Sequence, residues 1–111
     1  MGKFQYNQMA KVDIDDRVLI HLQHVMSTKL RRGEPFAFTW RDDASLGGGR
    51  TTVWVNSSSA LVFKYYGSRQ PALNHRWLEA LMFAANSPNG LRAVPEPEDV
   101  GAVSSLTEAV A

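Results

Sequence analysis

The chain has 111 residues, of which 44% are hydrophobic and 10% aromatic, enough for one folded domain with its own core. Twelve basic and eleven acidic residues leave a net charge of +1, so net charge neither favours nor excludes a polyanionic partner. The chain has no cysteine, which excludes disulfides, thiolate metal sites and cysteine nucleophiles. No signal peptide or membrane-spanning apolar run is visible, and we expect a cytoplasmic protein.

The first elements are two strands and a helix. Alternating residues predict strands at 3–7 and 10–14, joined as a hairpin. Asp15 or Asp16 can cap the helix that follows. Its apolar residues recur at helical spacing, and Gly33 is a natural stop. The apolar stripe comprises Leu19, Leu22, Val25, Met26 and Leu30.

The middle of the chain favours three strands. Residues 36–41 alternate, with Phe36, Phe38 and Trp40 directed inward. A Gly-rich connection leads to a β-branched strand at 50–56, and a third strand follows at 60–66. Short turns separate these strands, and we expect an antiparallel meander.

A second helix is predicted from about Asn74, its cap, to Asn86, and a short last strand at 91–94. The order ββαβββαβ indicates an α+β two-layer sandwich, with two helices on one face of a mainly antiparallel sheet. We place one domain at residues 1–95. Residues 96–111 are acidic and poor in large apolar side chains, which predicts a flexible tail.

Cations cluster where the second helix begins. Arg69, His75 and Arg76 lie at or near its first turn, where the helix dipole favours acids. An anion bound among them is one interpretation, and solvated or acid-paired cations are the other. A second group of cations is Arg31 and Arg32 at the end of the first helix, with Arg41 and Arg50 flanking the Gly-rich loop.

The sheet face away from the helices is a second candidate surface. Trp54, Lys64 and Tyr66, with Arg41, are expected on this face. Tryptophan, tyrosine and arginine are frequent at protein interfaces, which favours association with a protein partner or a second copy. Aromatic residues among cations also suit single-stranded nucleic acid. Ordinary solvated charge is the third alternative.

Catalytic motifs are weak. Residues 11–14, KVDI, approach the Lys-x-Asp-Gly motif in which a ligase lysine is adenylated, but Ile14 replaces the glycine and no further nucleotide motif follows. The stretch LGGGRTT lacks the Gly-Lys-Ser/Thr of a phosphate loop. His21 and His24 lack a third ligand at a known metal-site spacing, so we expect surface or boundary histidines.

Three segments, HLQHVMSTKLRRGEPFAFTW, GSRQPALNHRWLEALMFAANSPNGL and VPEPED, together resemble a family of short actinobacterial proteins of unknown function. Members of that family often carry the label ATP-dependent DNA ligase. The resemblance spans residues 1 to 98 and implies a compact bacterial or phage-borne domain. It implies no active site, because Lys11 lacks the ligase motif around it.

We therefore expect a small non-catalytic binding domain that associates with itself or a protein partner. The alternatives are nucleic-acid or other polyanion binding and, last, nucleotidyl transfer at Lys11. We expect no cofactor, no metal and no membrane partner.

Overall fold

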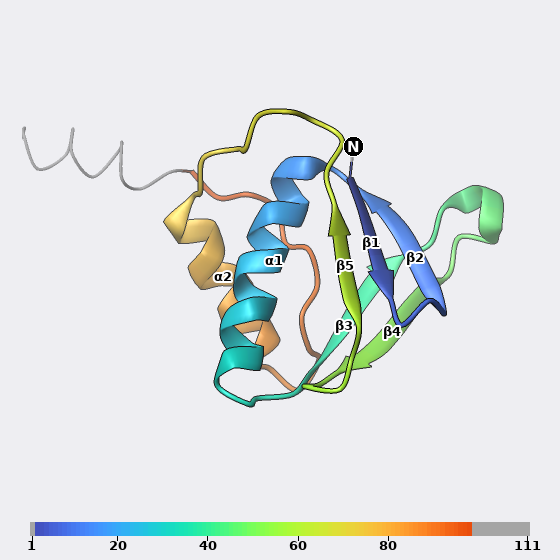
Figure 1. The fold of residues 1–111 in the computed structure, drawn as a ribbon, viewed down its shortest axis with the longest axis horizontal. Coiled ribbons are helices and arrows are strands. Elements are labelled where there is room, and N and C mark those ends of the chain that lie inside the picture. The colour runs from blue at the N-terminus through green and yellow to red at the C-terminus, as the bar shows by residue number, and fades with distance from the viewer. Residues whose placement is uncertain (1, 99–111) are drawn as a thin grey trace, which may run out of the picture.

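The computed structural model describes residues 2–98 and confirms the α+β class (Figure 1). Its elements follow the predicted order, apart from the last strand. They are β1 (Gly2–Tyr6), β2 (Ala10–Ile14), α1 (Asp16–Arg31), β3 (Phe36–Arg41), the short 3-10 helix η1 (Ala44–Leu46), β4 (Arg50–Val55), β5 (Leu61–Lys64) and α2 (His75–Ala85).

The helix termini agree with the sequence signals. Asp15 caps α1 by accepting from the Arg17 N–H, and Asn74 caps α2 by accepting from the N–H groups of Arg76 and Trp77. Gly33, just beyond α1, has a φ of 70°, which glycine adopts without strain.

The strands form two antiparallel sheets instead of one. The first has the order β2-β1-β5 and the second pairs β3 with β4. The meander that we predicted over β3, β4 and β5 is therefore wrong at its last step, because β5 pairs with β1. Backbone and side-chain hydrogen bonds between Asn7 and Ala60 hold the β1–β2 turn against the start of β5. The turn after β4 thus carries the chain from one sheet to the other.

The predicted last strand is reduced to a single parallel bridge between Leu91 and Phe38. The Leu91 N–H donates to the Ala37 carbonyl, and the Leu91 carbonyl accepts from the Thr39 N–H. Residues 91–94 thus begin along the edge of β3 that β4 leaves open.

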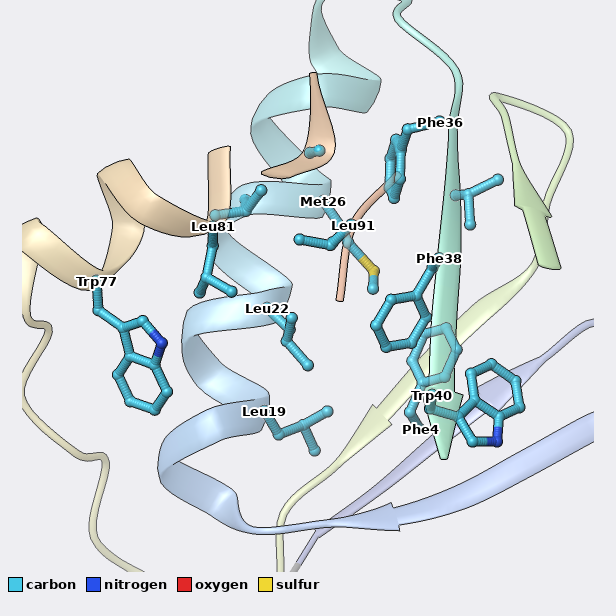
Figure 2. Close-up of a cluster of buried hydrophobic side chains, with 13 residues drawn as sticks. Phe4, Leu19, Leu22, Met26, Phe36, Phe38, Trp40, Trp77, Leu81 and Leu91 are labelled. Atoms are coloured by element: carbon cyan, nitrogen blue, oxygen red, sulfur yellow. The ribbon is translucent and has the colours of Figure 1, made fainter. Parts of the chain in front are cut away.

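The core lies between the helices and the inner faces of both sheets (Figure 2). The Phe4 ring of β1 meets the rings of Phe38 and Trp40 in β3 edge to face, with centroid distances of 5.2 and 5.9 Å. Helix α1 packs on α2 and β1, and α2 also contacts β3. The predicted inward residues of β3 are all buried.

Candidate anion-binding cleft

Strand β2 is the outer strand of the first sheet (Figure 1). A cleft of about 400 Å³ opens beside it. Its walls come from β2, from β3 and from the segment that follows the Leu91 bridge, and Leu22 of α1 contributes to its lining. Among the described strands β2 pairs with β1 alone, so its second edge faces the cleft without a neighbouring strand. The lining residues are Val12, Asp13, Ile14, Leu22, Phe38, Thr39, Trp40, Arg41, Arg50, Arg92 and Ala93.

Three arginines line this cleft. Arg41 and Arg50 are directly opposite each other in the β3–β4 register, and Arg92 follows the residue that bridges to β3. Like charges directly opposite on neighbouring strands destabilise a sheet. Within residues 2–98 none of the three guanidinium groups makes a hydrogen bond or ion pair with the protein. All three arginines are exposed, and Arg41 also lines a neighbouring hollow with Asp42 and Asp43, but no carboxylate of residues 2–98 lies within ion-pair distance of the three guanidinium groups.

One carboxylate shares the cleft with the arginines. Asp13 lines it from β2, and the Asp13 Oδ1 lies 4.0 Å from the Lys3 Nζ. The local charge of the lining residues stays positive, because three guanidinium groups face one carboxylate that already has a cationic neighbour. Such a site attracts anions.

Trp40 lines the same cleft. The residue is 8% exposed, and its indole N–H makes no hydrogen bond within residues 2–98. The Nε1 of Trp77, in contrast, donates to the Val94 carbonyl at 2.9 Å. The Trp40 Nε1 is not among the buried polar atoms of the described residues that lack a partner, so it is open to solvent.

The start of α2 already has an anion from the chain itself. The guanidinium group of Arg17 donates to both carboxylate oxygens of Glu96, and Asn74 Nδ2 donates to Glu96 Oε2 at 3.0 Å. These hydrogen bonds lower the pKa of Glu96 to about 2. The Glu96 carboxylate thus lies beside the helix cap. Arg17 and Asn74 bind it, whereas the predicted cations Arg69, His75 and Arg76 do not.

Those cations are exposed and are not gathered in one cavity. Arg69 lines a hollow of about 330 Å³ with Tyr65 and Pro71, and His75 and Arg76 do not contribute to its lining. Arg31 and Arg32 lie at the end of α1, away from the arginine cleft. Of the seven predicted anion-binding residues, the cleft brings together Arg41 and Arg50.

The predicted aromatic face is divided between the two sheets. Trp54 belongs to β4, whereas Lys64 ends β5, and these strands do not pair. Lys64 Nζ lies 5.5 Å from the centre of the Tyr66 ring, a cation–π contact. Trp54 therefore lies in the second sheet, whereas Lys64 and the adjoining Tyr66 lie at the end of β5, which pairs with β1 in the first sheet.

His21 is fully buried, so the expectation of surface or boundary histidines is wrong for this residue. Its Nδ1 lies 2.6 Å from the Arg17 carbonyl, and its Nε2 accepts from the Asn74 N–H at 2.8 Å. His24 is exposed, as expected. Within residues 2–98 no group of three or more His, Cys, Asp or Glu side chains is placed to hold a metal ion.

Comparison with known proteins gives a family but no function. Residues 1–96 match the domain of unknown function DUF7882. The chain belongs to this family. No curated protein and no solved structure matches the chain. The matched region of this DUF7882 domain includes the three cleft arginines and extends to Glu96.

Two further findings concern the limits of the DUF7882 domain. Glu96 and Pro97, which we assigned to the flexible tail, are bound to Asn74, so the folded part extends past residue 95. Residues 99–111 of the predicted tail lie outside the described residues. In the part of the chain that the structure describes, no helix has the length and apolar character needed to cross a membrane.

Arg92 and Trp40 line the cleft but are not among the anion-binding or interface residues predicted from the sequence. The sequence does give a signal for Arg92. In the segment predicted as a strand, Leu91 is expected to point inward and the adjacent Arg92 outward. Trp40 was assigned to the core from its alternation, and this is correct for most of its surface. No signal in the sequence shows that Trp40 also lines a cleft.

Proposed function

We propose that this DUF7882 domain is a small non-catalytic binding domain, and that its arginine cleft recognises an anionic group of its ligand. The observation that carries the proposal is the cross-strand pair Arg41 and Arg50, with Arg92 in the same cleft and no ion-pair partner for any of them within residues 2–98. Arginine suits this role because its planar guanidinium group can bind carboxylate and phosphate in a bidentate manner.

The test is thermal unfolding in phosphate and in chloride at equal ionic strength. We expect phosphate to stabilise the wild type, because a ligand that binds the folded state alone raises its stability. Arg50→Gln should remove this gain. Without phosphate the same variant should be more stable than the wild type by about 0.2–1 kcal/mol, since the repulsion between Arg41 and Arg50 is relieved.

Arg76→Gln is the matched control, because Arg76 is exposed and lies outside the cleft. It should keep the full stabilisation by phosphate. If Arg76→Gln loses the phosphate effect and Arg50→Gln keeps it, the anion site is at the start of α2, and the cleft proposal is wrong.

A polyanion is the first alternative ligand. For single-stranded nucleic acid the logarithm of the affinity should fall with the logarithm of the salt concentration, with a slope of about −0.7 per phosphate contacted. Binding that depends on Arg41, Arg50 and Arg92 with a steep salt slope would favour nucleic acid. A shallow slope would favour a ligand with a single anionic group.

Association with a protein partner or a second copy is the second candidate. The observation in its favour is that Trp54 is 56% and Tyr66 55% exposed, and aromatic residues of this kind carry much of the binding energy at interfaces. Light scattering after size exclusion at low and high salt tests it. An oligomer that persists at both salts and disappears in Trp54→Ser would support it, and a monomer throughout would contradict self-association.

The proposed function does not include catalysis. Nucleotidyl transfer at Lys11, which the label ATP-dependent DNA ligase would imply, is therefore not expected. Lys11 is exposed on β2 and lines a neighbouring hollow. Its charged residues are three cations and three carboxylates, Lys3, Lys11, Arg41, Asp13, Asp42 and Asp43, so this hollow has no excess of positive charge for the phosphates of a nucleotide. Incubation with ATP and Mg²⁺ followed by mass spectrometry should give no adenylated Lys11. A cytoplasmic location, which the lack of cysteine favours, belongs to the same proposal.

A further inference from the structure

The arginine cleft has an apolar interior as well as a cationic rim. On the inner face of β2, Val12 and Ile14 are only half-buried, whereas the inward Phe4 on β1 is fully buried. Leu22 and Phe38, both almost completely buried, also contribute to the lining. Apolar surface of the first sheet is therefore left uncovered where the cleft opens.

The size of the cleft limits what can fill it. Pockets for small organic ligands have volumes of about 300–1,000 Å³ and combine apolar walls with a few polar groups. The volume of about 400 Å³ lies at the lower end of this range. A ligand with one ring and one anionic group fits such a space, whereas inorganic phosphate would leave the apolar walls uncovered.

We infer that the cleft binds an organic anion whose carboxylate or phosphate group meets Arg41, Arg50 and Arg92, and whose apolar body of one aromatic ring lies between Ile14 and Trp40. This inference rests on the proposed function and adds the class of ligand. The ring would cover the half-exposed side chains of β2 and pack against the Trp40 side chain. Figure 2 shows Trp40 at the end of β3, beside Phe4 and Phe38.

The experiment compares four probes by NMR titration of the wild-type protein at one ionic strength. They are inorganic phosphate, phenyl phosphate, benzoate and the neutral benzyl alcohol. We expect phenyl phosphate to bind about ten-fold more tightly than phosphate, because burial of a ring adds apolar contact. Benzoate should also bind, and benzyl alcohol should bind at least ten-fold more weakly than phenyl phosphate.

Two variants with bulkier side chains locate the ring. Ile14→Phe should fill the cleft and reduce phenyl phosphate binding to the level of phosphate, with phosphate binding unchanged. Val62→Phe is the matched control, because Val62 is 49% exposed on β5 and does not line the cleft. It should leave the affinities for all four probes unchanged.

A second measurement needs no variant. Intermolecular nuclear Overhauser effects in the wild type should connect the phenyl protons with the methyl groups of Ile14, and not with those of Val62. Their absence at saturating phenyl phosphate would overturn the inference even if Ile14→Phe fails to fold.

The outcomes separate this inference from the proposed function. Equal affinity for phosphate and phenyl phosphate, both lost in Arg50→Gln, would overturn the inference and leave the anion site in place. No binding of any anion would overturn both. Equal binding of benzyl alcohol and phenyl phosphate would also overturn the inference, because the arginines would then contribute nothing to recognition.

Discussion

His21 has ring nitrogens with opposite hydrogen-bonding roles, and both partners are backbone groups. The Asn74 N–H can only donate, so Nε2 must carry a lone pair, and the proton is on Nδ1, which donates to the Arg17 carbonyl. Protonation of the ring would put an N–H on Nε2, directly against the N–H of Asn74. Burial of the ring lowers the pKa of His21 below 6.5.

This arrangement predicts that acid weakens the fold near neutral pH. The folded state holds His21 neutral, and the unfolded state binds the proton more readily, so the free energy of unfolding should fall as the pH drops below 6.5. Each unit by which the folded pKa lies below 6.5 contributes about 1.4 kcal/mol to this loss. Urea unfolding at several pH values measures the free energy of unfolding, and an NMR titration of the ring measures the pKa of His21.

His24→Gln provides the control, because His24 is exposed. The variant should keep the pH dependence of the wild type, and His21→Gln should lose it. A His21 pKa at or above 6.5 in the folded protein would contradict the prediction.

Glu96 gives a second pH effect in a separate range. Its ionised form accepts from Arg17 and Asn74, which lowers its pKa from 4.5 to about 2. The stabilisation by this carboxylate is therefore complete above pH 4.5 and is lost as the pH falls toward 2. Glu96→Gln should be less stable than the wild type at pH 7, and the difference should shrink across this range in acid-unfolding curves.

Glu98→Gln is the matched control for Glu96, since Glu98 is exposed and makes no ion pair within residues 2–98. Its stability at pH 7 should equal that of the wild type. Equal stability of Glu96→Gln and Glu98→Gln would show that the contact with Arg17 does not stabilise the fold.

The helices and strands follow from local sequence, but the bridge between Leu91 and Phe38 depends on a glycine, Gly90. Gly90 has a φ of 80°, and a Cβ there would lie 2.7 Å from the Ala37 carbonyl oxygen. The close approach lets Leu91 bridge to Phe38, and this bridge places Arg92 at the cleft.

Gly90→Ala should therefore destabilise the protein by about 1–3 kcal/mol, because the left-handed backbone is strained in alanine and the carbonyl must move. Gly49→Ala is the control, since its Cβ would meet no atom within 4 Å and its φ is not positive. We expect chemical denaturation to separate the two variants. Equal stability would contradict the role given to Gly90.

The whole molecule is held together by contact between two sheets that share no paired strands. Phe4 of the first sheet is fully buried and contacts the rings of Phe38 and Trp40 in the second. The ring of Phe63 in β5 also packs against the Phe4 ring, with a centroid distance of 5.4 Å. One side chain thus links three strands across the core.

Phe4→Ala should cost about 3–5 kcal/mol, because it removes a large buried side chain and leaves a cavity. Phe83→Ala should change stability by no more than about 0.5 kcal/mol, since Phe83 is 79% exposed on α2. Denaturation by urea, with the slope compared between variants, measures both. Similar losses for the two variants would show that the Phe4 contacts do not hold the sheets together.

The sequence alone was enough to predict the helices, their caps, the first hairpin and the inward residues of β3. These features depend on periodicity and on short-range hydrogen bonds, which neighbouring residues determine. Asn74 and Asp15 are examples, because the groups that they cap lie within three residues of each.

Only the tertiary structure decided which strands pair and which arginines share a site. The alternation in β5 is compatible with β4 or β1 as neighbour, and the contacts of Asn7 with Ala60 favour β1. Glu96 and Arg17 are far apart in the sequence, as are Arg92 and Arg41, so no local pattern could join them. Arg41 and Arg50 come together through a local hairpin, but the approach of Arg92 and of β2 to this pair depends on the packing of the whole chain.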